Sequence, residues 1–242
     1  MKDRASQRLT RRKALAVLGG AAAAAFLRDG RAKPTSRAYA AALPSCVVRP
    51  EQTEGPYFVD EKLNRSDIRV EPSDNSAKPG VPLTLEFQVS RIADGVCAPL
   101  SGAVVDIWHC DALGVYSGVR DRSLDTRGKK FLRGYQITGA NGIARFVTIF
   151  PGWYEGRTVH IHFKIRADGA ARRSSEFTSQ LYFDESVIEE IHNSAPYDSK
   201  GRRRTTNRDD FIFRRGGNQL LLKLTREDQS YAAKFDIGLQ LA

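Results

Sequence analysis

The stretch Thr158-Val-His-Ile-His-Phe-Lys-Ile-Arg166 alternates polar and apolar side chains along its whole length. Successive side chains of a β-strand point to opposite faces, so this alternation predicts a strand with one buried face. His160 and His162 would share the other face, whereas on a helix they would lie about 200° apart. The side chains of the buried face are Val159, Ile161, Phe163 and Ile165.

Period-two patterns of this kind recur along the chain, and they predict an all-β fold, an antiparallel β-sandwich with long loops and at most short helices. The cluster Gly139-Ala-Asn-Gly142 lies between two such patterns and predicts a hairpin. A short helix is expected only at Glu185–His192. No domain boundary is visible within residues 41–242. The further strands are expected at Val81–Val89, Ala103–His109, Arg133–Thr138, Ala144–Phe150, Thr178–Phe183, Gln219–Leu224 and Lys234–Leu239.

The net charge of the chain is concentrated at its start. Of 242 residues, 38 are Lys or Arg and 28 are Asp or Glu, which gives a formal charge of +10. Residues 1–40 hold ten of the basic and two of the acidic residues, or +8, so the rest of the chain carries only +2. A charge that small provides no general field for polyanions, and no nucleic acid is expected as a partner. The hydrophobic content of 41% excludes disorder for the bulk of the chain.

The first 40 residues have the composition of an export signal. A basic segment ending in Thr10-Arg-Arg-Lys13 precedes an uncharged, Ala-rich run over Ala14–Leu27, and Ala38-Tyr-Ala40 offers the small residues of a cleavage site. That run is too short to cross a bilayer core of roughly 30 Å, so no stable membrane span is expected. The paired arginines predict a cleaved twin-arginine signal, the Tat export machinery as a partner, and a periplasmic or extracellular location. An ordinary secretion signal and a basic tail are the alternatives.

The cysteines leave the disulfide pattern open. Cys46, Cys97 and Cys110 are an odd number for an exported protein, so one is left over after any bridge. Three different single pairings are compatible with the sequence, and nothing in the spacing chooses among them.

Two tyrosines near the histidine pair suggest the kind of metal that it would hold. The chain has only four histidines, and no second His-rich or acidic cluster completes a zinc site. Tyr154 precedes the pair in a Pro-Gly turn, and Tyr116 follows a predicted strand. A phenolate is a hard anionic donor, so two imidazoles with two phenolates suit Fe(III) better than Zn(II). Taken singly, any one of the eight tyrosines is better explained by an ordinary packing role.

These residues lie within motifs of a known family. The anchors are Glu51-Gln-Thr-Glu-Gly-Pro-Tyr57, Pro99–Trp108, Gly114-Val-Tyr116, Arg133-Gly-Tyr-Gln136 and Phe150-Pro-Gly-Trp-Tyr-Glu-Gly-Arg-Thr-Val-His-Ile-His162. Over about residues 46–184 the sequence resembles the intradiol ring-cleavage dioxygenases, which include the catechol and protocatechuate dioxygenases, and within them the extracellular, intradiol-like branch. The resemblance implies that residues 41–242 form a catalytic β-sandwich whose long loops are active-site loops.

The resemblance also implies a site, a cofactor and a reaction. Fe(3+) would cleave the ring of catechol-type aromatic diols with O2, between the two hydroxyl-bearing carbons, to give muconic-acid-type products. Strict alternation would turn Arg157 away from the site, so the family match requires a turn at Gly156. The implied iron ligands are Tyr116, Tyr154, His160 and His162. The implied catalytic residues are Arg157, Gln180 and Tyr154, and the implied substrate-binding residues are Thr53, Gly55, Pro56, Tyr57 and Trp153.

Two other classes of protein compete with this interpretation. One is an exported, non-catalytic β-sandwich binding module, and the other is a zinc or copper enzyme that uses the pair of His160 and His162. The resemblance leaves open whether the diol is catechol, protocatechuate, hydroxyquinol or another, and oligomer formation is also open. His109 is expected to be structural, and His192 is expected to be exposed.

Overall fold

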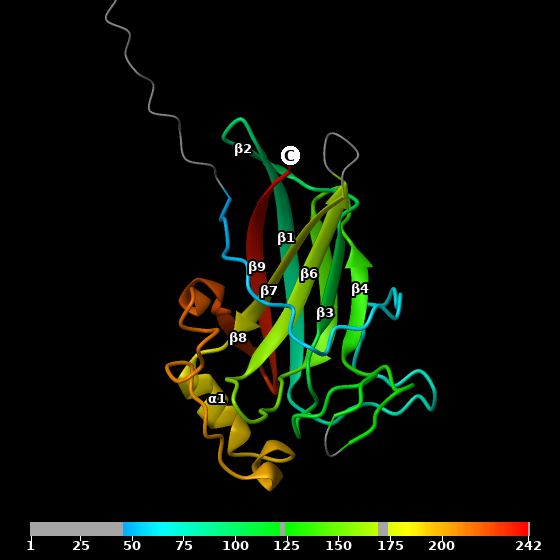
Figure 1. Ribbon diagram of the computed structural model, residues 1–242, viewed down its shortest axis with the longest axis vertical. Helices are drawn as coiled ribbons and strands as arrows, with labels where there is room; N and C mark the ends of the chain where they lie inside the picture. The colour runs from blue at the N-terminus through cyan, green and yellow to red at the C-terminus, as the bar shows by residue number, and fades with distance from the viewer. Residues whose placement is uncertain (1–45, 122–123, 169–173, 242) are drawn as a thin grey trace, which may run out of the picture. The chain divides into compact units, whose positions relative to one another are not determined.

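The computed structural model describes residues 46–121, 124–168 and 174–241, and these form two facing β-sheets (Figure 1). They lie within one compact unit, residues 41–242. The export signal predicted for residues 1–40 lies outside the described residues. The strands are β1 Pro82–Ala93, β2 Val96–Pro99, β3 Val104–Trp108, β4 Arg133–Ile137, β5 Ile143–Ile149, β6 His160–Asp168, β7 Ser174–Tyr182, β8 Leu224–Glu227 and β9 Ser230–Gln240. The helix is α1 Glu185–His192, and 3₁₀ turns lie at Tyr197–Lys200 and Gly217–Leu220.

The sandwich prediction is confirmed, with one parallel strand pair. One sheet has the order β2-β1-β9-β8, with β5 also paired to β1, and the other has the order β4-β3-β6-β7. Every named pair is antiparallel except β1 with β9, which run parallel from Leu83 beside Tyr231 to Ile92 beside Gln240. Parallel neighbours need a long connection, and here residues 94–229 lie between the two strands.

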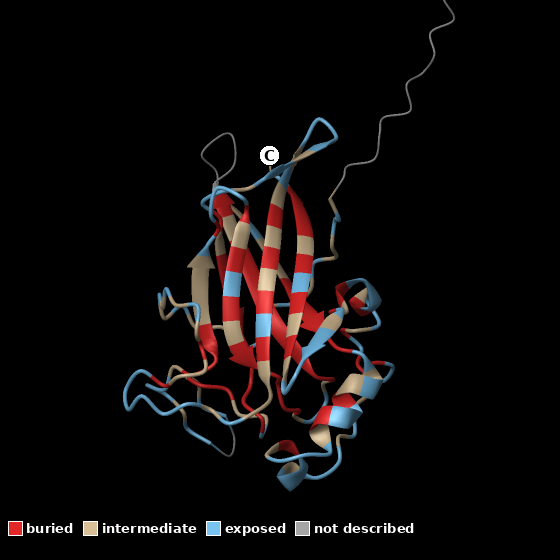
Figure 2. Cartoon of the chain, turned by 180° about the vertical axis from the view of Figure 1, so that it is seen from behind, coloured by how far each residue is buried: buried red, intermediate tan, exposed pale blue. Residues whose placement is uncertain are grey.

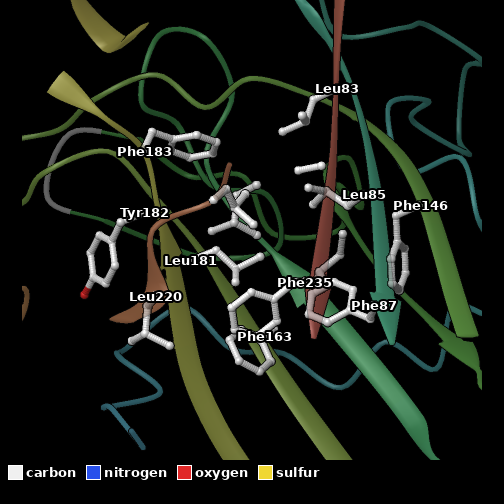
Figure 3. Packing of buried hydrophobic residues seen from close by; sticks show 14 of the residues in the cluster. Leu83, Leu85, Phe87, Phe146, Phe163, Leu181, Tyr182, Phe183, Leu220 and Phe235 are labelled. Carbon is white, nitrogen blue, oxygen red and sulfur yellow. The ribbon is translucent and has the colours of Figure 1, made fainter. Parts of the chain in front are cut away.

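The core lies between the two sheets, and buried residues alternate with less buried ones along much of β1, β5 and β9 (Figure 2). Phe163 of β6 projects from one sheet, and its ring centroid lies 5.4 Å from those of Phe87 and Phe235 on the other (Figure 3). Ile161 and Ile165 are fully buried on the same face of β6. The apolar face predicted for this strand is therefore the core face, and His160 and His162 project from the opposite side of the sheet.

The hairpin predicted around Gly139–Gly142 is wrong. The turn itself forms, since the Gly142 amide donates to the Gly139 carbonyl over 2.9 Å. The strands that it joins nevertheless belong to different sheets, with β4 paired to β3 and β5 paired to β1. The same turn residues serve a hairpin and a corner between sheets, so the local sequence could not tell the two apart.

The strand predicted at Gln219–Leu224 is also wrong, and β2 was not predicted. The chain forms a 3₁₀ turn at Gly217–Leu220, and β8 begins only at Leu224. Leu220 and Leu222 are buried with a less buried residue between them, so the segment has the alternation of a strand. It pairs only through an isolated bridge between Leu221 and Tyr182 and does not form a ladder among the described residues. The predicted helix at Glu185–His192 is confirmed, and the Asp184 carboxylate caps it by accepting from the Ser186 amide over 3.0 Å.

A strap of residues 51–60 crosses β7 and β6 on the outer face of their sheet (Figure 1). The Gln52 amide donates to the Thr178 carbonyl of β7. Lys164 of β6 pairs with Glu54 of the strap, and its ammonium lies 4.2 Å from the Phe58 ring centroid. Lys164 follows His162 by two residues, so the strap contacts the same face of β6 that carries the histidines.

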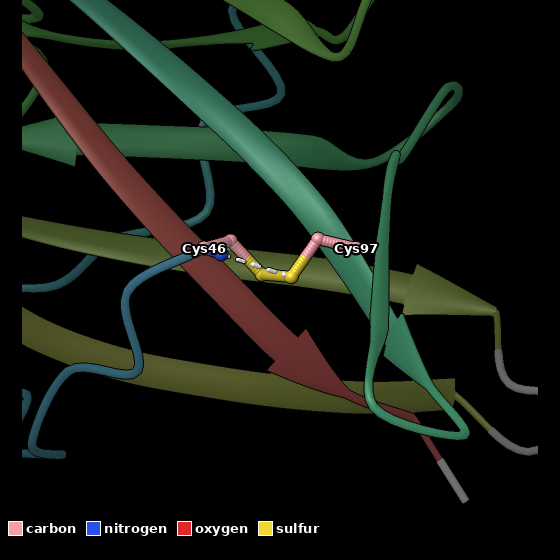
Figure 4. The surroundings of a disulfide bond; sticks show 2 residues. All are labelled: Cys46 and Cys97. Atoms are coloured by element: carbon pink, nitrogen blue, oxygen red, sulfur yellow. Dashed lines mark hydrogen bonds between the residues drawn. A yellow bond between two sulfur atoms is a disulfide. The ribbon is translucent and has the colours of Figure 1, made fainter. Parts of the chain in front are cut away.

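A disulfide joins the first described residue to the sandwich. Cys46 bonds to Cys97 of β2 across a sequence separation of 51 residues (Figure 4). Cys110 is free and buried, and burial raises the pKa of its thiol to about 12. The tertiary structure thus chooses among the three pairings that the sequence left open. Among the described residues, no helix has the length and hydrophobicity that a membrane crossing requires.

Replacing Cys97 with serine should lower the free energy of unfolding by about 4 kcal/mol, because the 51-residue loop is then no longer closed in the unfolded chain. Urea unfolding at fixed pH measures this loss. A reducing thiol should bring the wild-type protein to the same value and leave the variant unchanged. A variant as stable as the oxidised wild type would contradict the prediction.

Candidate active site

Two buried imidazoles form the centre of the site. The Nε2 atoms of His160 and His162 lie 3.0 Å apart, and each residue is at most 2% exposed. The Nδ1 atom of His160 donates to the Thr158 carbonyl over 2.7 Å, which leaves its Nε2 with a free lone pair. Burial, together with the charge of Arg157, lowers the pKa of both imidazoles well below the ordinary value. Both rings are therefore neutral and able to act as ligands.

Two tyrosine hydroxyls converge on the same point. The Oη atom of Tyr154 lies 3.1 Å from His160 Nε2, and that of Tyr116 lies 3.5 Å from it. The loops that carry them pack together through Gly152, where an added Cβ would stand only 2.2 Å from the Ala112 carbonyl oxygen. The sequence-predicted ligands from two loops and one strand thus meet in one place, as four donor atoms.

The four donors suit a trivalent cation. Burial raises the pKa of both Tyr116 and Tyr154 above the ordinary value, so neither would ionise there without a strong positive charge. Two phenolates would offset two of the three charges of Fe(3+), and the neutral imidazoles would complete the set. Among the described residues there is no group of three His, Cys, Asp or Glu side chains that could hold a metal. The chemistry of the donors therefore favours ferric iron over zinc.

His162 is held by ring packing instead of a hydrogen bond. Its Nδ1 atom is buried without a hydrogen-bond partner in the described part of the chain. The Trp108 ring stacks on the imidazole with centroids 5.0 Å apart and planes 6° apart. On the strap, an added Cβ at Gly55 would stand 3.1 Å from His162 Cε1, and the positive φ of this residue also favours glycine. The strap therefore reaches the histidine pair through a residue without a side chain.

Arg157 and Gln180 lie beside the donors, as the sequence predicted. Gly156 has a φ of +82° and turns the chain just before β6. Arg157 therefore precedes the strand, and the alternation of strand faces does not set the direction of its side chain. Its Nη1 atom lies 3.4 Å from His160 Nε2, and its Nη2 donates to the Gln180 side chain. Burial opposes the charge of Arg157, but Tyr154 and Asp210 outweigh it and raise the pKa overall.

A cleft of about 670 Å³ leads from the surface to the tyrosines. Tyr57, Tyr116 and Tyr154 line it, and the rings of Tyr57 and Tyr116 stack with centroids 4.5 Å apart. The half-exposed Leu113 and Leu124 form part of its wall. An open cleft lined by both donor tyrosines is the arrangement expected for a site that admits a small molecule.

Similarity to known proteins agrees with this geometry. A family model described as Dioxygenase matches residues 53–240. A solved structure of an intradiol ring-cleavage dioxygenase from Tetranychus urticae is 33% identical, with a TM-score of 0.67, and the match covers 81% of this chain and 94% of that one. The chain belongs to the intradiol ring-cleavage dioxygenase family.

Two other relatives show how much of the chain is shared with other proteins. The dioxygenase domain of a dioxygenase carbohydrate-binding protein fusion from Streptomyces sp. SirexAA-E is 34% identical, with a TM-score of 0.56, and covers 81% of this chain and 100% of that one. A chlorocatechol 1,2-dioxygenase from Pseudomonas sp. (strain P51) is 32% identical over 146 residues, or 54% of each chain. The chain thus spans about half the length of the curated relatives that it matches.

The structure places the predicted substrate-binding residues at different distances from the cleft. Tyr57 lines it, and Gly55 touches His162, so Pro56 lies on the strap between two residues of the site. Thr53 contributes its carbonyl, which accepts from the Gln180 side chain over 2.8 Å. Trp153 is not among the lining residues, because its ring is buried in the main core while its neighbour Tyr154 faces the cleft.

The remaining two histidines lie away from the donors. His109 Nδ1 donates to the Cys110 carbonyl over 2.8 Å, and its Nε2 then accepts from the Thr148 hydroxyl over 2.7 Å. Both ring nitrogens are used, so His109 is structural, as expected. His192 is less exposed than expected, because its ring stacks on Tyr197 with centroids 5.1 Å apart.

Asp210 was not identified from the sequence, although it contacts Arg157. Its fully buried carboxylate accepts from Arg157 Nε over 2.8 Å. It lies 53 residues downstream in an irregular loop, next to the exposed Asp209, and no spacing or motif distinguishes the two. Only the tertiary structure shows which of these adjacent carboxylates is part of the site.

The buried His109 should make stability depend on pH. Burial lowers its pKa to about 4 in the folded chain, whereas the unfolded imidazole titrates near 6.5. Between these values the unfolded state binds more protons, so the free energy of unfolding should fall as pH drops from 6.5 to 4, by about 1.4 kcal/mol per pH unit from this group. The stabilisation is fully present above pH 6.5.

Urea unfolding of the iron-free protein across this pH range measures the slope. The variant His109→Asn removes the titrating group and should have a shallower slope by about one proton. Equal slopes for variant and wild type would contradict the burial of a neutral His109.

Proposed function

We propose that the chain is a non-haem Fe(III)-dependent dioxygenase. It cleaves the ring of a catechol-type diol between the two hydroxyl-bearing carbons, and both atoms of O2 enter a muconic-acid-type product. The observation that carries the proposal is the convergence of two tyrosine hydroxyls and two imidazole Nε2 atoms beside a largely buried arginine, with both tyrosines lining an open cleft. Family membership supports it, and the relatives named as chlorocatechol and catechol 1,2-dioxygenases point to catechols.

The ligand roles follow from the positions of the four residues. His160, His162, Tyr116 and Tyr154 would hold the ion. Bound Fe(3+) would supply a Lewis acid for the diol oxygens and a route for electron density from the diol to O2. Tyr116 is 5% exposed and sits deeper, whereas Tyr154 is only partly buried and faces the cleft. Tyr154 would therefore be the ligand that the diol replaces, and its oxygen would accept one of the two diol protons.

Arg157 and Gln180 act on the diol without binding the ion. The Nη1 atom of Arg157 points at the donor cluster, so its fixed charge stabilises negative charge that develops on the diol as the ring becomes reactive. Gln180 is fully buried and accepts from Arg157 while its amide donates to the Thr53 carbonyl. It links the arginine to the strap that forms one wall of the site.

We also propose that the protein works outside the cytoplasm. The twin-arginine pattern of the leader supports export, and the Cys46–Cys97 disulfide suits an oxidising compartment. Fusion of residues 1–40 to a reporter that is active only after Tat export tests this. Replacement of Arg11 and Arg12 by lysine should abolish export, and unchanged export would show that another route is used.

The activity is tested by a visible absorption spectrum and metal analysis of the purified protein, before and after catechol is added without oxygen. The proposal predicts about one iron per chain, a red-brown charge-transfer band and a shift of that band with catechol. Admission of oxygen should then give a ring-opened dicarboxylic acid. A colourless protein containing zinc, or one with a copper spectrum, would favour the competing metal enzyme. A folded protein that binds no metal would favour the binding module.

A further inference from the structure

A buried carboxylate that the proposed chemistry does not use lies behind Arg157. Asp210 is fully buried, and its Oδ2 atom accepts from Arg157 Nε over 2.8 Å and from the Thr158 amide over 2.9 Å. Its Oδ1 atom accepts from the amides of Ile212 and Phe213 over 2.7 and 3.1 Å. Four N–H donors thus surround one carboxylate. Its charge is fully compensated, and its position is fixed relative to the backbone on both sides.

The guanidinium of Arg157 is anchored at two of its three nitrogens. Nε donates to Asp210 and Nη2 donates to Gln180. Nη1 is the nitrogen that reaches the donor cluster, 3.4 Å from His160 Nε2. Because a guanidinium is planar and rigid, fixing Nε and Nη2 also fixes the direction of Nη1. The Arg157 side chain is only 12% exposed, so its charge depends on the carboxylate behind it.

The loop that carries Asp210 is itself attached to the start of β6. Asn207 accepts from the Thr158 hydroxyl over 2.6 Å and donates to the Phe183 carbonyl over 2.8 Å. Thr158, the residue after Arg157, therefore donates its hydroxyl to Asn207 and its amide to Asp210. A loop from the C-terminal part of the chain supports the turn that aims the arginine.

We propose that Asp210 is the positioning residue for Arg157. It holds the guanidinium so that Nη1 faces the bound diol, and it supplies the countercharge that keeps the buried arginine in place. The proposal rests on the function proposed above. It predicts that the effect of Asp210 on turnover passes through Arg157 and through no other group.

A double-mutant cycle tests this in the iron-loaded enzyme with catechol. Asp210→Asn should keep iron and the tyrosinate colour while kcat falls by about tenfold or more. Arg157→Ala should lose more, and the variant with both changes should be no slower than Arg157→Ala alone. The control is Asp209→Asn, since the neighbouring carboxylate is exposed and accepts hydrogen bonds from Thr206 of its own loop. Its kcat should match the wild type.

The proposal would be overturned if the two substitutions reduced kcat independently of each other. If Asp210→Asn slowed the Arg157→Ala enzyme by the same factor as it slows the wild type, Asp210 would act on the scaffold and not through the arginine. Wild-type kcat in Asp210→Asn would overturn it equally. If Asp210→Asn does not fold, Asp210→Glu replaces it, since this variant keeps the charge and displaces the carboxylate by one methylene. A reduced kcat with full iron content is then the expected result, and wild-type kcat again contradicts it.

A second readout does not depend on activity. In urea unfolding of the iron-free protein, Asp210→Asn should lower the midpoint because Arg157 is left buried without its countercharge. Adding Arg157→Ala should restore part of the lost midpoint. If the decreases in midpoint caused by the two single substitutions simply added, the two side chains would not be coupled. An inactive wild type would defeat the proposed function and the positioning role together. An active wild type with independent losses would defeat the positioning role alone.

Discussion

His162→Ala is expected to abolish iron binding, colour and ring cleavage. The change removes one of four converging donors, and the surroundings of the ring, Trp108 and Gly55, offer no replacement ligand. Losing a group that merely supports a ligand weakens metal binding by roughly 10–100-fold, so losing the ligand itself should weaken it by more than about 100-fold. The iron-to-protein ratio after dialysis and the visible spectrum measure the result.

The fold should survive this change, so the loss of iron can be read directly. The Nδ1 atom of His162 has no hydrogen-bond partner among the described residues, and truncation therefore breaks no hydrogen bond at that atom. His192→Gln is the matched control, because this histidine lies away from the donors, with its Nε2 on the Pro151 carbonyl. It should retain iron and colour. An iron-loaded, coloured and active His162→Ala protein would refute the ligand assignment.

Arg157→Ala is expected to keep iron and lose turnover by a factor of roughly 10² or more, the size seen when a donor to a developing negative charge is removed. The four donors to the ion remain, so the charge-transfer band should persist. The positive charge beside the diol is lost, and the carboxylate of Asp210 is left buried without its partner. Steady-state kcat with saturating catechol, together with iron analysis, separates these effects.

The conservative change Arg157→Lys makes the prediction more specific. A lysine ammonium is a point charge and cannot bond Asp210 and Gln180 in the rigid fork that the guanidinium forms. It should keep iron and recover only part of the lost rate. Wild-type turnover in Arg157→Ala would remove the arginine from the mechanism, and loss of iron from that variant would give it a role in holding the ion.

Local sequence patterns predicted the strands that carry the chemistry. The alternation over Thr158–Arg166 places Ile161 and Phe163 in the core and His160 and His162 on the other face, and this is the arrangement found in β6. Such a prediction works because strand alternation is a property of a few consecutive residues. The turn at Gly156 needed the family resemblance, since alternation alone turned Arg157 the wrong way.

Pairing over long distances could not be predicted in the same way. The Gly139–Gly142 turn was recognised, but whether β4 and β5 pair with each other depends on β3 and β1, which lie elsewhere in the chain. The disulfide partner of Cys46 is set by the approach of β2 to the first described residue. These choices follow from the packing of whole sheets, which no short segment contains.

The sequence by itself determined the all-β class and the shared face of His160 and His162, and its residue types led to the hypothesis of an Fe(3+) donor set. These are matters of side-chain chemistry and of a two-residue period, and both can be read from neighbouring residues. Only the tertiary structure decided that Tyr116 and Tyr154 reach the same imidazole, and that Asp210 rather than Asp209 holds Arg157. Those contacts join loops that are far apart in the chain, and their geometry exists only once the two sheets have packed.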